Sequence, residues 1–193
     1  ITPGVYKLSN GVAAPITTFT ERNKRVNSVY GTATLSYANK IFLDVTGRND
    51  WSSTLPSGNN SFFYPSVSTS FILSDLLRLP EQISFAKLRA SWAQVGNDTD
   101  PYKTAKYYNT SAFPGSASVS PTLYNARFKP EISNSIEVGL DWRMFKQRFG
   151  LDLAFYNNIT RNQILDVPMD QTTGYTKATM NSGKVRNRGI ELQ

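Results

Sequence analysis

Apolar and polar residues alternate with a period of two along most of the chain, which is typical of β-strands with one apolar face. Around residue 44, Leu43 and Val45 alternate with Asp44 and Thr46. The pattern recurs in about seven stretches, at 28–37, 41–48, 63–73, 86–92, 136–144, 149–156 and from 184 onward. It predicts consecutive antiparallel strands.

The connections between these stretches differ in length. Those at 38–40, 74–82 and 146–148 are short, whereas those at 11–25, 49–61, 96–134 and 161–182 are longer and rich in turn residues. In an up-and-down sheet, this alternation puts the short turns at one rim and the long loops at the other. Bacterial outer-membrane barrels have that asymmetry, with short periplasmic turns and long extracellular loops.

The charged residues inside the predicted strands share the polar face. They are Asp44, Arg48, Lys87, Arg89, Glu137, Asp141, Arg143 and Asp152. A Lys or Arg that faces lipid at mid-bilayer costs about 2–4 kcal/mol, so the uncharged face suits lipid and the charged face suits a lumen. The sequence predicts an all-β fold, a segment of an antiparallel up-and-down transmembrane β-barrel. A soluble β-sandwich with one buried face would show the same alternation.

Composition narrows the functional classes. The chain has no histidine and no cysteine, which removes the commonest general base and the thiolate metal ligands. We expect no enzyme, no catalytic residues, no cofactor and no metal site. The stretch 98–100 lacks the glycine and the distal glutamate of a calcium loop. The net charge of +7 comes from scattered basic residues, so nucleic-acid binding is not expected.

The two ends of the sequence suggest a piece of a longer protein. The first residues, 1–4, have neither the basic start nor the apolar core of a signal peptide, and the last residues stop inside an alternating pattern. No apolar run of about 18 residues, the length of a membrane-spanning helix, is present. We expect residues 1–193 to be part of one barrel domain.

Several segments together resemble the C-terminal half of SusC/RagA-like TonB-linked outer-membrane proteins. They are 47–56 (GRNDWSSTLP), 62–66 (FFYPS), 85–92 (FAKLRASW) with 95–98 (VGND), 128–131 (FKPE) leading into 135–140 (SIEVGL), and 181–191 (NSGKVRNRGIE). They occur in the family's order across almost the whole chain.

The resemblance implies a 22-stranded barrel closed by a plug, of which this chain would supply about seven strands. It implies active import of an oligosaccharide or peptide across the outer membrane of a Gram-negative bacterium. The implied partners are a SusD-like surface lipoprotein, TonB, the lipid bilayer and the substrate. The plug domain and the TonB box, through which TonB acts, would lie outside residues 1–193.

Two other functions stay open at this point. One is a TonB-dependent siderophore or cobalamin receptor that works without a lid lipoprotein. The other is a secreted glycan-binding β-sandwich, which predicts that the chain by itself is soluble and folds cooperatively.

Candidate contact residues follow from side-chain chemistry. Aromatic rings stack on sugar faces or peptide side chains, and the candidates for substrate or partner contact are Trp51, Tyr102, Tyr107, Tyr108 and Tyr124. The candidates for the lumen or plug-facing surface are Arg48, Asp50, Lys87, Arg89, Glu137, Asp141 and Arg143. Both sets also have a structural interpretation, in which the rings pack the loops and the charges pair within the wall.

Overall fold

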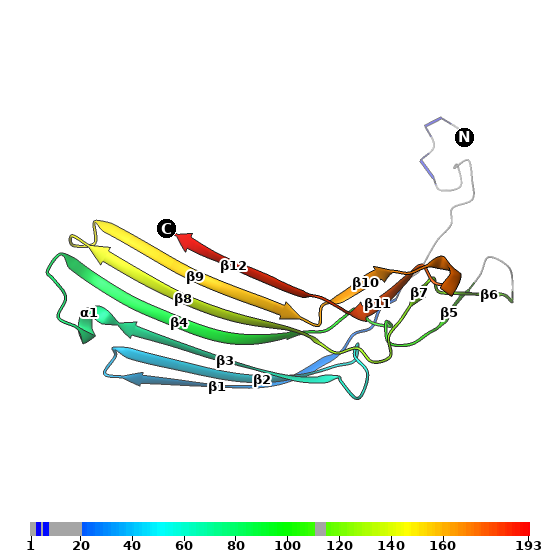
Figure 1. Ribbon diagram of the computed structural model, residues 1–193, viewed down its shortest axis with the longest axis horizontal. Helices are drawn as coiled ribbons and strands as arrows, with labels where there is room; N and C mark the ends of the chain where they lie inside the picture. Colours follow the sequence, from blue (N-terminus) through cyan, green and yellow to red (C-terminus); the bar gives the residue numbers. More distant parts are fainter. Residues whose placement is uncertain (1–2, 5, 8–20, 111–114) are drawn as a thin grey trace.

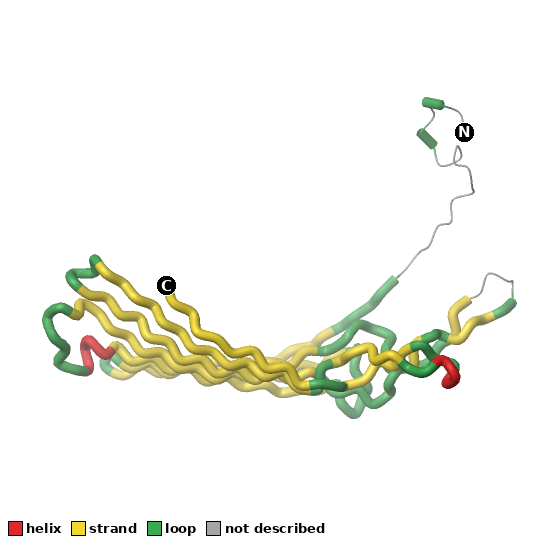
Figure 2. Tube along the Cα trace, turned by 45° about the horizontal axis from the view of Figure 1, so that its top comes forward, coloured by secondary structure: helices red, strands yellow, loops and turns green. Residues whose placement is uncertain are grey.

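The computed structural model describes residues 3–4, 6–7, 21–110 and 115–193, and its main feature is one curved antiparallel sheet (Figure 1). The strands lie in the order β1 (Val26–Tyr37), β2 (Ile41–Ser52), β3 (Ser61–Ile72), β4 (Ile83–Asn97), β8 (Glu131–Met144), β9 (Phe149–Arg161) and β12 (Lys184–Leu192). Figure 2 shows this sheet as a single layer. A sandwich would pack two sheets face to face. The prediction of a barrel wall is therefore confirmed, and the sandwich alternative is wrong.

The register of the strands keeps like residues together on each face. Leu88 of β4 lies opposite Leu140 of β8, and the next residue pair joins Lys87 with Asp141. Because the pleat turns successive side chains to opposite faces, each strand has one apolar and one polar side. We call the side that carries Lys87, Arg89 and Asp141 the charged face, and the side that carries Leu88 and Leu140 the apolar face.

The connections lie at two opposite rims of the sheet (Figure 1). Connections 38–40, 73–82 and 145–148 form the short-turn rim, whereas 53–60, 98–130 and 162–183 form the long-loop rim. The predicted alternation in length is wrong at one place, because 73–82, which holds helix α1 (Leu73–Leu76), is no shorter than 53–60. Strands β2 and β3 extend further than their alternation indicated. The predicted loop 11–25 lies largely outside the described residues.

The two longest loops contain short elements of their own. These are β5 (Tyr108–Thr110), β6 (Ala117–Val119), β7 (Thr122–Leu123), β10 (Ile164–Pro168), the 3₁₀ helix η2 (Gln171–Thr173) and β11 (Lys177–Asn181). Strand β7 pairs in parallel with β11, which pairs with β10, so the two loops form one small sheet. The sequence did not predict these strands, because alternation over two to five residues gives no readable pattern.

An apolar cluster fastens the loops to the long-loop rim. Leu55, Phe62 and Phe128 are buried together, and Tyr64 and Ile164 pack against them. Phe128 belongs to the loop between β4 and β8, and its side chain is 0% exposed. The cluster therefore joins three connections of the same rim.

A glycine makes room for this cluster. A Cβ added at Gly96 would lie 2.3 Å from Cδ2 of Phe62, so the Phe62 ring rests directly on the backbone of β4. Any side chain at this position would displace the ring. Gly96 is thus required by a close approach, and not by its dihedral freedom.

Replacing Phe128 with alanine should release the β4–β8 loop from the rim. Loss of a fully buried phenylalanine costs about 3–5 kcal/mol, so limited proteolysis should cut within 98–130 much faster than in the parent protein. The matched control is Phe63→Ala. Phe63 follows the cluster residue Phe62 on β3, but its side chain is 58% exposed. Equal cleavage rates in the two variants would contradict the anchoring role.

Candidate functional site

The centre of the charged face is an ion pair that spans three strands. Nη1 and Nη2 of Arg89 on β4 donate to the two carboxylate oxygens of Asp152 on β9, each at 2.9 Å. Nε of Arg89 lies 3.8 Å from Oε1 of Glu137 on β8. A planar guanidinium that meets a carboxylate at two points has both its position and its orientation fixed. Arg89 thus ties β4, β8 and β9 together across the charged face.

A glycine on the middle strand allows this contact. Gly139 of β8 pairs with Arg89 on one side and with Ala154 on the other. A Cβ built on Gly139 would come within 2.3 Å of Nε of Arg89. The arginine therefore reaches Asp152 by lying flat on the backbone of the strand between them.

The other charged candidates form separate pairs. At the long-loop end of β2, Nε of Arg48 donates to Asp50 at 2.8 Å, and the Tyr64 hydroxyl donates to the same carboxylate. Near the short-turn rim, Nη2 of Arg143 lies 3.3 Å from the carboxylate of Asp141. Lys87, Arg89, Glu137, Asp141 and Arg143 thus do not join in one continuous set of ion pairs within the described residues. The described residues show a central cluster around Arg89 and an isolated pair on β8.

Lys87 lines a recess instead of joining a pair. No carboxylate in the described part of the chain lies within 4.0 Å of its ammonium group. The recess has a volume of about 260 Å³ and is lined by Asp44, Ser68, Thr69, Ser70, Lys87, Arg89, Ala90, Ser91 and Glu137. It offers a cation and several hydroxyl groups on the charged face.

The aromatic candidates do not form one surface. The register of β2 puts Trp51 on the apolar face at the long-loop end, opposite Asn27 and Ser61. Tyr107 and Tyr124 stack on each other, with ring centroids 5.6 Å apart. Burial and the hydrogen bond to Tyr124 raise the pKa of Tyr107 to about 12. These two rings therefore hold the loop together.

The two remaining tyrosines are more accessible. Tyr102 is about half exposed, and its hydroxyl accepts a hydrogen bond from the backbone N–H of Asn23 at 3.1 Å. Tyr108 on β5 is 74% exposed. Of the predicted rings in the loops, these two present the most surface to a ligand or partner.

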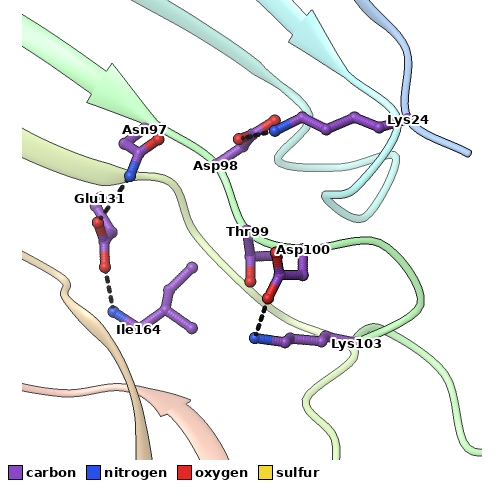
Figure 3. A pocket seen from close by; sticks show the side chains of 8 residues that line it. All are labelled: Lys24, Asn97, Asp98, Thr99, Asp100, Lys103, Glu131 and Ile164. Atoms are coloured by element: carbon purple, nitrogen blue, oxygen red, sulfur yellow. Dashed lines mark hydrogen bonds and ion pairs between the residues drawn. The ribbon is translucent and has the colours of Figure 1, made fainter. Parts of the chain in front are cut away.

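A polar pocket lies at the long-loop rim (Figure 3). Its volume is about 320 Å³, and it is lined by Lys24, Asn97, Asp98, Thr99, Asp100, Lys103, Glu131 and Ile164. Asn97 ends β4, Glu131 begins β8 and Ile164 begins β10. We call it the rim pocket.

Asp98 organises one wall of the rim pocket. It accepts from Nζ of Lys24 at 2.5 Å, from Ser52 at 2.5 Å and from Thr54 at 3.2 Å. Ser52 and Thr54 are buried and bond to each other at 2.9 Å. The carboxylate therefore joins the end of β2, the end of β4 and the segment that precedes β1.

The other wall is held by two further polar contacts. Oε1 of Glu131 accepts from the Ile164 amide at 2.6 Å, and Oε2 accepts from the Asn97 side chain at 3.2 Å. Lys103 pairs with Asp100 at 3.0 Å and lowers the pKa of that carboxyl. Both lysines of the pocket are thus neutralised inside it, and apart from Ile164 the other lining residues carry polar side chains.

The small loop sheet carries a similar pair beside this site. Nζ of Lys177 donates to Asp166 at 2.6 Å, and the Thr179 hydroxyl donates to the other oxygen at 2.6 Å. These bonds lower the pKa of Asp166, while Asp166 raises the pKa of Lys177. The pair fixes β10 against β11.

The sequence did not single out the rim pocket. Its residues come from four separate segments, and only 98–100 had been considered, as a calcium loop. The usable signal was the position of Asp98 and Glu131 at the ends of two strands joined by a long loop. In the described ranges, no group of three or more acidic residues is arranged to hold a metal ion, and no helix is long and apolar enough to cross a membrane.

Comparison with known proteins gives consistent matches. TonB-dependent receptor P26 of Formosa agariphila is 31% identical over 177 residues, which covers 87% of this chain and 18% of the relative. TonB-dependent receptor P3 of the same organism is 29% identical over 173 residues, covering 86% of this chain and 17% of the relative. The chain thus spans about a fifth of the length of these curated relatives.

Solved structures show the same fold at lower identity. The RagAB peptide importer in its closed-closed state matches 99% of this chain and 22% of that chain, with a TM-score of 0.83 and 22% identity. The siderophore receptor PirA from Pseudomonas aeruginosa matches 88% of this chain and 30% of that chain, with a TM-score of 0.62 and 17% identity. The family described as TonB dependent receptor-like, beta-barrel, matches residues 3–193. The chain belongs to that family.

Proposed function

We propose that this chain forms part of the wall of an outer-membrane importer that takes up an oligosaccharide or a peptide together with a SusD-like surface lipoprotein. The choice of substrate class rests on the residues that line the rim pocket. Its cations are paired internally, so the groups left for a ligand are hydroxyl, amide and carboxylate groups that exchange hydrogen bonds. Sugar hydroxyls and peptide amides match such a lining.

The match to a peptide importer supports the same choice. RagAB is described as a peptide importer, and its fold matches this chain over a larger share and with a higher TM-score than the siderophore receptor PirA does. The alternative is that this chain belongs to a TonB-dependent receptor that transports siderophores. It draws on the PirA match over 88% of the chain.

The charged face is proposed to face the lumen, where it would contact the plug. The Arg89–Asp152 pair is half-exposed in this chain by itself, so a plug packed on it would exclude water from both charges. TonB would act on that plug from the periplasm. The exposed tyrosines Tyr102 and Tyr108 are the proposed contacts for substrate or for the lid lipoprotein.

Import is tested by deleting the receptor gene in its host and measuring growth. We expect growth on one oligosaccharide or peptide mixture as sole carbon source to be lost, because molecules of that size do not cross the outer membrane unaided. A proton uncoupler should abolish uptake of the labelled substrate in the parent strain, and growth on monosaccharides is the control. Loss of growth only when iron is supplied as a siderophore complex would replace this proposal with its alternative.

Asp98→Ala should weaken substrate capture. The change leaves the donors of Lys24, Ser52 and Thr54 without their shared acceptor and loosens the rim pocket, so affinity should fall about tenfold. Uptake of the labelled substrate as a function of its concentration gives the affinity. Asp75→Ala is the matched control, since Asp75 lies in α1 at the opposite rim. Unchanged uptake by the Asp98 variant would argue against the rim pocket as a substrate site.

Asp152→Asn tests whether the plug covers the charged face. If the face is covered, loss of the two-point contact between Arg89 and Asp152 should cost about 3 kcal/mol of unfolding free energy, and adding Arg89→Gln should restore much of that loss. Urea unfolding in detergent measures both. The control pair is Asp141 and Arg143, for which the same changes should cost less than about 1 kcal/mol. A similarly small effect at Asp152 would mean that the face lines open water.

A further inference from the structure

Acidic and basic residues are distributed unequally between the two faces of the main sheet. By the strand registers, the carboxylates of its strands lie on the charged face: Asp44, Asp50, Glu131, Glu137, Asp141, Asp152 and Glu191. The apolar face carries charges of one sign only, and they are confined to β9 and β12. We call Arg161, Lys184, Arg186 and Arg188 the outer-face cations.

The register brings the outer-face cations together. Lys184 lies directly opposite Arg161, Arg186 opposite Ile159 and Arg188 opposite Asn157. Nε of Arg186 donates to Oδ1 of Asn157 at 2.7 Å, which holds the guanidinium against β9. Like charges that face each other across a strand pair destabilise it. This arrangement therefore calls for an anion on the same face.

The described part of the chain provides no such anion. Every outer-face cation is exposed, and no carboxylate there lies within 4.0 Å of any of them. Glu191, the acidic residue nearest in sequence, pairs with Ala154 and so lies on the charged face. An acidic residue on the same face of a neighbouring strand would be the competing source of the anion.

The height of the cations above the short-turn rim points to the lipid headgroups. Below them, β9 presents Phe149, Leu151, Leu153 and Phe155, and β12 presents Ile190 and Leu192. From Phe149 to Asn157 the strand rises about 26 Å, or about 20 Å along the membrane normal at the usual tilt. The apolar band of a barrel is about 25 Å tall, so Arg188 lies just below its upper border and the other outer-face cations lie at or above it.

We propose that the outer-face cations bind the phosphate groups of the anionic glycolipid in the outer leaflet of the outer membrane. Arginine suits this role because its planar donor fork matches phosphate oxygens, and Arg186 is already oriented by Asn157. The apolar residues below would contact the acyl chains of the same lipid. The inference rests on the outer-membrane location in the proposed function, but not on the transported substrate.

The experiment uses the full-length receptor purified in a zwitterionic detergent. Binding of bisphosphorylated lipid A is measured by native mass spectrometry for the parent and for Arg186→Gln combined with Arg188→Gln. We expect the double variant to bind lipid A about tenfold more weakly. Lys146→Gln combined with Arg148→Gln is the matched control, because it removes two cations from the short-turn rim, and its affinity should stay within twofold of the parent.

Further measurements decide between lipid and other occupants. Phosphatidylcholine should bind the parent weakly and equally in all variants, and inorganic phosphate at equal concentration should not displace lipid A. Full displacement by inorganic phosphate would overturn the proposal in favour of a small-anion site. A lower melting temperature of the double variant in lipid-free detergent would overturn it in favour of an acidic contact within the receptor itself.

Unchanged lipid A affinity in the double variant would also overturn the proposal. Uptake of the labelled substrate is followed in parallel. Normal uptake together with unchanged lipid affinity in the variant would reject the lipid site and leave the import proposal standing. If the variant binds lipid A more weakly as expected but the receptor imports siderophores, the lipid site stands and the import proposal is rejected.

Discussion

The structure depends on the requirement that each strand separate apolar from charged side chains. In a bilayer, backbone polar groups must be satisfied within the protein, which favours strands paired on both sides. The pleat then sends alternate side chains to lipid and to the lumen. Leu88 and Leu140 meet on one face while Lys87 and Asp141 meet on the other. The same alternation governs all seven strands of the main sheet.

Glycines let the two faces carry contacts that cross strands. Arg89 reaches Asp152 because Gly139 leaves the backbone of β8 bare beneath it, and the Phe62 ring lies on Gly96 in the same way. The first contact stiffens the middle of the wall, and the second anchors the rim. The residues behind the family resemblance, such as Phe62, Gly96 and Phe128, thus meet in space at the long-loop rim.

Charge is used differently at each level of the wall. At mid-sheet, acidic and basic residues pair on the charged face. At the long-loop rim, Lys24 and Lys103 are neutralised within the rim pocket. The outer-face cations have no acidic partner in the described ranges of the chain, and they lie where the apolar band ends. The paired charges therefore stabilise the wall itself, whereas the outer-face cations are available to a group outside the chain.

The sequence by itself determined the all-β class, the antiparallel order and the face of the charges inside the predicted strands, but not the face of the outer-face cations at the ends of β9 and β12. These follow from a period of two, which is a local property of extended backbone. The tertiary structure alone decided which charges meet, because Arg89 and Asp152 are 63 residues apart and Lys24 and Asp98 are 74 apart. It also decided the short strands of the loops and the rim pocket. Their contacts join distant segments, and register and loop packing are set by partners that no local pattern contains.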